Sequence, residues 1–244
     1  MKTKFLSLLM IISLNSFSQE YSMKDTLRTQ VFSLSPISKN VDKVNGLVFG
    51  LGHLDNKHVS VQIINGLNIE ANPAPIAGTF IAFLGIIYLP EIIKNSNEEF
   101  RLKKLKGDQL KIKDFDAVSN LKLNGINLST GCFLTNTSMN GLNISLGNKF
   151  KKFNGLSIAP LGTISTIQNG VSIGLINANN NLNGISVGVY NQSFNLKGLQ
   201  LGICNISKSN NGIQIGIFNK SYSKGFQLGL WNKNLKRSLP ILNW

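Results

Sequence analysis

The sequence predicts an all-β protein of tandem repeats of about 14 residues, with a β-solenoid as the favoured architecture. Residues 170–232 hold five similar units, of which G-I-Q-I-G-I-F-N is typical, and their leading glycines are spaced 14, 14, 14 and 13 residues apart. Within a unit the aliphatic residues alternate with other residues, which is the period of a β-strand. An Asn-Gly pair often precedes the strand and is typical of a turn, because both residues tolerate positive φ.

The position of the polar residues decides between the architectures. An asparagine recurs after each strand, at Asn177, Asn191, Asn205, Asn219 and Asn232. Stacked coils would place these asparagines side by side, where their amides can form a ladder. We expect the aliphatic triplets, such as Ile213, Ile215 and Ile217, to form the continuous core of the stack. The mid-strand glycine, Gly216 in this unit, lies on the opposite face from the aliphatic residues.

Two alternatives stay open. A closed or rolled antiparallel β-barrel explains the turns equally well, and the mid-strand glycine favours a strongly bent sheet. An outer-membrane barrel would need an apolar band of about 25 Å, whereas an aliphatic triplet spans only about 13 Å. Pro240 would also interrupt the last strand of such a barrel, because proline has no backbone N–H.

The N-terminus has the layout of a secretory signal peptide over residues 1–18. Lys2 and Lys4 precede the apolar stretch 5–14, and Ser16-Phe17-Ser18 supplies small residues at a cleavage site. Residues 19–44 are interpreted as a lead-in strand or loop.

Cys132 and Cys204 are five units apart, so stacking would separate their sulfurs by about 24 Å. We therefore expect two free, mostly buried thiols.

Residues 45–120 are interpreted as degenerate repeats with two insertions. Unit-like segments begin at Gly46 and Gly66. They are followed by the almost wholly apolar stretch Pro75–Leu89, which is shorter than the 20 or so residues of a membrane-spanning helix. We interpret it as a buried structural element, with a membrane-contacting hairpin as the alternative. Residues 101–113 are rich in lysine and suggest an exposed hairpin, with a helix over residues 92–105 as the alternative.

The regular array covers residues 121–234, and residues 235–244 form a closing segment. One unit departs from the pattern, because Ala159-Pro160-Leu161-Gly162 replaces its second half. We expect this coil to be kinked.

The units resemble a family of bacterial surface-repeat proteins built from tandem G-L-Q-I-G-L-x-N segments, found in leptospires and in Bacteroidetes-type bacteria. The residues that carry the resemblance are G-I-Q-I-G-I-F-N, G-F-Q-L-G-L-W-N and the closing L-P-I-L-N-W. It covers residues 123–244 well and 44–69 weakly. The resemblance implies export and a location in the cell envelope or on the surface, and it implies no activity.

The residue types needed for catalysis are scarce. No aspartate, glutamate or histidine follows Asn120, so acid–base catalysis within the array would depend on lysine, tyrosine or cysteine. His53 and His58, with Asp55 between them, are interpreted as a solvated turn and not as a metal site. We predict no catalytic residue, no metal and no cofactor.

We therefore expect an exported, non-enzymatic cell-envelope or surface protein that acts as a scaffold or binding module, located in the periplasm, in the outer membrane or on the cell surface. The alternatives are an outer-membrane or membrane-associated protein and, less favoured, an enzyme with a site before Asn120.

The formal charge of +14 favours acidic partners, although scattered lysines argue against nucleic acid. Partners would be a cell-surface glycan or protein, or a membrane. The oligomeric state stays open. An outward aromatic and amide stripe is the expected contact surface: Tyr190, Gln200, Gln214, Phe218, Gln227 and Trp231.

Overall fold

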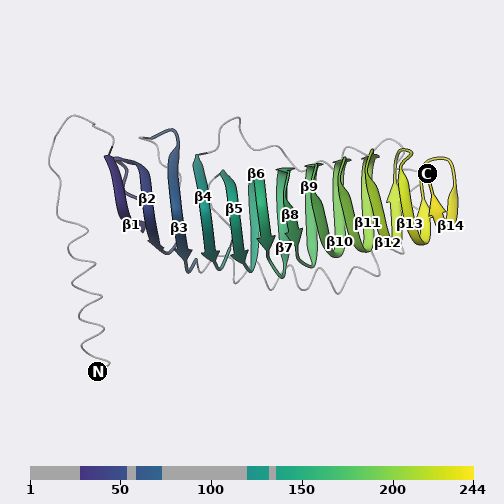
Figure 1. The fold of residues 1–244 in the computed structure, drawn as a ribbon, viewed down its shortest axis with the longest axis horizontal. Helices are drawn as coiled ribbons and strands as arrows, with labels where there is room; N and C mark the ends of the chain where they lie inside the picture. Colours follow the sequence, from purple (N-terminus) through teal and green to yellow (C-terminus); the bar gives the residue numbers. More distant parts are fainter. Residues whose placement is uncertain (1–27, 54–58, 73–119, 132–135) are drawn as a thin grey trace, which may run out of the picture.

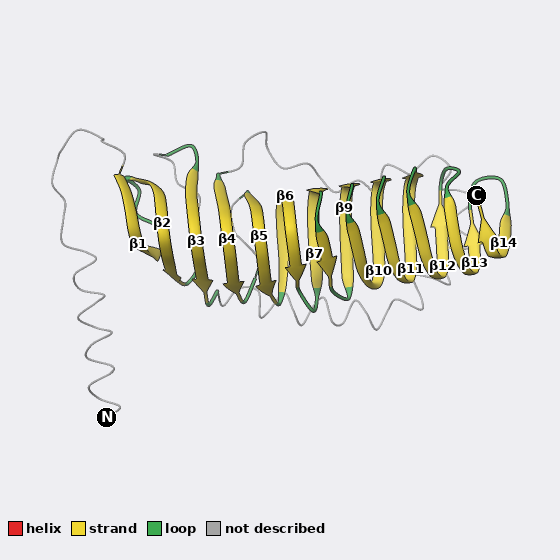
Figure 2. Cartoon of the chain, in the orientation of Figure 1, coloured by secondary structure: helices red, strands yellow, loops and turns green. Residues whose placement is uncertain are grey.

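The computed structural model describes residues 28–53, 59–72, 120–131 and 136–244, and every regular element among them is a β-strand (Figure 1 and Figure 2). The strands form one long stack that follows the order of the chain (Figure 1). Their bounds are β1 Arg28–Ser35, β2 Val41–Gly50, β3 Gln62–Glu70, β4 Leu121–Ser129, β5 Thr137–Ser145, β6 Gly147–Ile158, β7 Gly162–Gln168, β8 Val171–Ile173, β9 Ile176–Leu182, β10 Ile185–Leu196, β11 Leu199–Asn210, β12 Ile213–Ser221, β13 Phe226–Lys233 and β14 Ser238–Asn243.

Neighbouring strands from β1 to β13 pair in parallel, so the chain is a β-solenoid and the antiparallel alternative is wrong. The repeats stack in phase: Gly188 pairs with Gly202, and Gly202 pairs with Gly216. Equivalent residues of successive coils therefore form columns that run along the stack. Several of the features described below are such columns.

Each complete coil bends once within its strand region, which gives the solenoid two outer faces. Side chains of adjacent residues in a straight strand point to opposite sides, yet Ile217 and Phe218 are both exposed. At the equivalent place in an earlier coil the strand is interrupted between β8 and β9. The first face carries the residues that follow the leading glycine, and the second face begins at the position of Phe218.

The predicted asparagine ladder is confirmed. Each Nδ2 donates to the Oδ1 of the asparagine in the next coil, from Asn177 to Asn232, with lengths of 2.8–3.0 Å. The same amides also bond the backbone, as Asn205 does through Nδ2 to the carbonyl of Ile215 at 2.9 Å. The asparagines are buried, so the ladder satisfies polar groups that would otherwise be costly inside a protein.

The expected location of the core is wrong. The triplet Ile213, Ile215 and Ile217 points outward, with exposed fractions of 42%, 36% and 39%, whereas Gln214 between them is fully buried. The alternation of the sequence was interpreted with the correct period but with the inner and outer faces exchanged. The exchange is stable because identical polar side chains in stacked coils lie within hydrogen-bonding distance of one another.

An apolar interior exists mainly in the N-terminal half. Its members form one buried cluster: Ile37, Val41, Val44, Val48, Ile64, Leu121, Leu123, Met139, Phe150 and Phe153. Phe150 and Phe153 stack with their centroids 5.2 Å apart. Further along the stack the interior becomes polar, and Leu182 and Leu196 are the apolar side chains still buried beside Asn210. The solenoid thus changes from an apolar to an amide-rich interior along its length.

The mid-strand glycines lie on the inner face, opposite the aliphatic residues, as expected. A Cβ atom at Gly216 would lie 2.1 Å from the carbonyl oxygen of Gly202 and 2.5 Å from Nδ2 of Asn205. Glycine is therefore required here by the close approach of the next coil and the asparagine ladder.

The closing segment forms a different kind of strand. β14 pairs with β13 in the antiparallel sense and ends the parallel stack. Asn243 continues the inner glutamine column, because its Nδ2 donates to Oε1 of Gln227 at 3.1 Å. Arg237 holds Asn243 in turn, with Nε donating to its Oδ1 at 2.9 Å. Pro240 lies at the irregularity in the β13–β14 register, where its missing N–H is tolerated.

The remaining sequence predictions concern the unit at Pro160 and several segments that the structure does not describe. The unit with Ala159-Pro160-Leu161 is interrupted as predicted, since β6 ends at Ile158 and β7 begins at Gly162. The signal peptide, the apolar stretch 75–89, the lysine-rich stretch 101–113 and Cys132 lie outside the described residues. Within the described ranges, no helix is long and apolar enough to cross a membrane.

Candidate functional site

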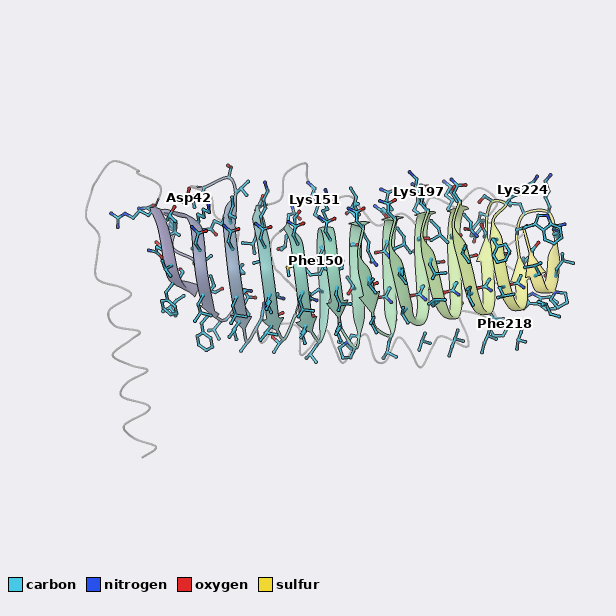
Figure 3. All side chains as sticks on the ribbon, viewed as in Figure 1. Asp42, Phe150, Lys151, Lys197, Phe218 and Lys224 are labelled. Carbon is cyan, nitrogen blue, oxygen red and sulfur yellow. The ribbon has the colours of Figure 1, made fainter. Side chains whose placement is uncertain are left out.

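The aromatic part of the expected contact stripe is a true column on the second face. The register places Ile176, Tyr190, Cys204, Phe218 and Trp231 side by side on consecutive coils. Phe218 and Trp231 are 42% and 53% exposed, and Phe218 projects from one edge of the stack (Figure 3). The column therefore presents two aromatic rings to the surroundings at its C-terminal end.

The expectation that the glutamines of that stripe face outward is wrong. Gln200, Gln214 and Gln227 are fully buried and do not stand beside the aromatic rings on the surface. Gln214 Nε2 donates to Oε1 of Gln200, and Gln227 Nε2 donates to Oε1 of Gln214, both at 2.8 Å. The three amides form an inner ladder, which leaves Tyr190, Phe218 and Trp231 as the outer members of the expected site.

Lysines accompany the aromatic column on the second face. Lys220 and Lys233 pair in register two residues beyond Phe218 and Trp231. Nζ of Lys208 lies 4.4 Å from the ring centroid of Phe194, and Nζ of Lys220 lies 5.5 Å from that of Tyr222. The second face therefore combines positive charge with aromatic rings, a combination that suits an acidic or carbohydrate ligand.

Cys204 and Tyr190 are less accessible than Phe218 and Trp231. The Cys204 side chain stands between the larger side chains of Tyr190 and Phe218, and the thiol is free and buried, as predicted. Burial raises the pKa of the Cys204 thiol to about 11, although Lys220 acts in the opposite direction. Burial also raises the pKa of Tyr190, whose hydroxyl donates to Oε1 of Gln192 at 3.1 Å.

We expect Cys204 to react slowly with thiol reagents. In a Cys132→Ser background, which leaves one thiol, iodoacetamide at pH 8 should modify the native protein on the order of 100-fold more slowly than the urea-unfolded protein. The thiolate is the nucleophile, and burial raises the pKa of this thiol to about 11. The rate should increase steadily toward pH 11. Mass spectrometry of timed samples measures it, and equal rates in the native and unfolded protein would contradict the burial of this thiol.

The first face is a sheet of outward aliphatic side chains. Its first column is Leu47, Leu67, Ile126, Leu142, Leu156, Val171, Ile185, Leu199, Ile213 and Phe226. Its middle column is Phe49, Ile69, Leu128, Ile144, Ile158, Ile173, Val187, Leu201, Ile215 and Leu228. Sequence reasoning assigned these residues to the core, so it missed this surface.

The aliphatic face also contains a shallow depression of about 750 Å³. It spans several coils and is lined by aliphatic side chains, including Pro160, Leu175, Val189 and Ile203. The interruption at Pro160 and the smaller Val187 and Val189 reduce the side-chain volume there. The face is therefore hollowed over the coils from β6 to β11.

A buried polar cluster lies near the N-terminal end. Nε2 of His53 is 2.5 Å from Oε1 of Glu70, and it is 3.3 Å from Oδ1 of Asn68. His53 is buried, which corrects the interpretation of this residue as part of a solvated turn. Asp55 and His58 lie outside the described residues. Among those that are described, no three acidic, histidine or cysteine side chains are grouped as metal ligands would be.

One feature of the sequence could have shown which side faces inward. The residues between the aliphatic ones are uniform in type, with serine, asparagine or glutamine two positions after the leading glycine from Gly66 to Gly225. Solvent-facing positions have no reason to be so uniform, whereas a ladder requires like side chains in register.

No protein-family model matches the sequence, and no curated protein or solved structure shows significant similarity to it.

Proposed function

We propose that this chain is an exported, non-enzymatic repeat protein of the cell envelope, in which the solenoid is a rigid scaffold. The observation that carries the proposal is the pair of buried amide ladders. They join Asn177 to Asn232 and Gln200 to Asn243 without a break. Side chains that bond their own neighbours in this way stiffen the stack and leave both outer faces available for contacts.

Composition and the N-terminal layout support the same proposal. Residues 1–18 fit an export signal. The coils after Asn120 contain no acidic side chain and no histidine, which suits a scaffold better than an acid–base catalyst.

Cell fractionation tests the export step. With an antibody raised against the purified protein, we expect the native chain in the envelope fraction or on intact cells, with residues 1–18 removed. A variant lacking residues 1–18 should stay in the cytoplasm. Recovery of the native chain in the cytoplasm with its N-terminus intact would exclude this function.

A binding role for the second face is a second candidate, because the register sets Phe218 beside Trp231 and Lys220 beside Lys233. An acidic glycan would stack on the rings and pair with the ammonium groups. Phe218→Ala should weaken binding on a glycan array, whereas Phe226→Ala should not. Both phenylalanines are 42% exposed, and Phe226 lies on the aliphatic face. Equal effects of the two changes would exclude the second face as the glycan site.

A further inference from the structure

The aliphatic face exposes more apolar surface than a monomeric soluble protein normally does. Two of its columns have ten members each, and successive coils are about 4.8 Å apart. The face is therefore roughly 45 Å long and its aliphatic triplets are about 13 Å across, which gives a flat area on the order of 600 Å². Monomeric soluble proteins rarely expose contiguous apolar patches larger than a few hundred Å².

Charge is also distributed around this face in an orderly way. Within the five residues that follow each leading glycine, the described part of the chain has one ionisable side chain, Glu70, which is buried and contacts His53. The lysines and arginines of the described residues all lie elsewhere. Lys151, Lys197 and Lys224 project from the edge of the stack opposite to Phe218 (Figure 3). Positive charge therefore borders this face, where Lys197 lies beside Ile185 and Leu199, and is absent from its two aliphatic columns.

We propose that the aliphatic face binds the same face of a second copy of this chain and forms a two-fold symmetric dimer. The area is sufficient for a dimer, since specific interfaces begin at about 600 Å² buried on each partner. The spacing matches as well, because both faces carry side-chain rows at the same repeat along the stack. Two such sheets pack about 10 Å apart with their side chains interdigitated, and a two-fold axis brings each row of one copy against rows of the other.

The proposal extends the scaffold role by naming the partner of one surface. The dimer proposal and the export proposal can be disproved independently of each other. A monomer found in the envelope fraction would exclude the dimer and leave the export proposal intact, and a dimer found in the cytoplasm would do the reverse.

The test is the mass of the protein in solution, measured by analytical ultracentrifugation from about 1 to 100 µM, a range that extends above the micromolar Kd of the weakest interfaces of this size. The protein is purified from cells that express the full chain. We expect a dimer at the upper end of this range. Ile173→Lys should weaken the dimer on the order of 100-fold, because the symmetry places two ammonium groups in the apolar interface.

Ile164→Lys is the matched control. Ile164 and Ile173 are 39% and 42% exposed, and Ile164 lies on the second face in register with Lys149 and Ala178. The control should dimerise as the native chain does. Leu201→Gln, an uncharged change in the middle column, supplies a second variant, and circular dichroism shows that each variant keeps its strands.

Three outcomes would overturn the proposal. The first is a monomer at 100 µM that binds no lipid vesicles. The second is equal weakening by Ile173→Lys and Ile164→Lys. The third is a monomer that binds vesicles of phosphatidylglycerol and loses this binding in Ile173→Lys, which would assign the face to a lipid surface.

Discussion

Asn205→Asp should destabilise the native protein by about 3–5 kcal/mol at neutral pH, although it replaces only an amide nitrogen by an oxygen. In the native chain, Nδ2 of Asn205 donates to Oδ1 of Asn219 at 2.8 Å and to the carbonyl of Ile215 at 2.9 Å. A carboxylate would set an oxygen against both acceptors in a buried position. Thermal unfolding measures the effect, and the expected decrease in Tm is roughly 10 °C.

The pH dependence of the same variant provides an independent check. Burial and the facing oxygens would raise the pKa of the new carboxyl above its value in the unfolded chain. A group with a raised pKa in the folded state stabilises the fold below its unfolded pKa and loses that contribution as the pH rises. The deficit relative to the native chain should therefore shrink as the pH falls from neutral toward about 4, and it should be smallest and constant below that value. Asn211→Asp, at an exposed turn position, should cost little at any pH, and a comparable loss there would contradict the ladder as the cause.

Gly216→Ala should destabilise the protein by about 3 kcal/mol, although alanine is the smallest possible addition. The new methyl group would meet the carbonyl oxygen of Gly202 at 2.1 Å. That oxygen belongs to the backbone of the neighbouring coil, so it can move only if the two strands separate. Chemical unfolding followed by circular dichroism measures the loss.

Gly147→Ala is the control for this steric argument. A Cβ atom at Gly147 has its nearest neighbour, Cβ of Leu161, at 3.4 Å, which is ordinary contact. We expect a change within about 0.5 kcal/mol there. If Gly147→Ala costs as much as Gly216→Ala, loss of glycine in general, and not the close approach of coils, explains the effect.

The architecture could be predicted because repetition is visible in a single sequence. The spacing of the leading glycines gave the coil length, the alternation within a unit gave the strand, and the constant asparagine gave parallel stacking in register. Each of these properties depends on residues a few positions apart or on identical residues one coil apart. The interruption at Pro160 followed from the same pattern.

The assignment of inside and outside could not be made in the same way. Alternation shows that Ile215 and Gln214 face opposite sides, and general hydrophobicity then favours Ile215 as the buried residue. The coils reverse this preference because Gln214 bonds Gln200 and Gln227, which are 14 and 13 residues away. The benefit of the ladder appears only after stacking, so a rule applied to one strand misses it. The candidate site changed with it, because three of its six residues became interior.

The hydrogen bonds of the inner glutamine column all run in the same donor-to-acceptor direction, and Arg237 fixes that direction. An arginine can only donate hydrogen bonds, so Arg237 requires the oxygen of Asn243 to face it. The NH₂ group of Asn243 must then point toward Gln227 and donate to its side-chain oxygen. In the same way, Gln227 donates to Gln214 and Gln214 donates to Gln200. A single reversed amide would bring two NH₂ groups together, so the row holds one orientation as a whole. One guanidinium at the end of the chain thus determines how an amide three strands away is oriented.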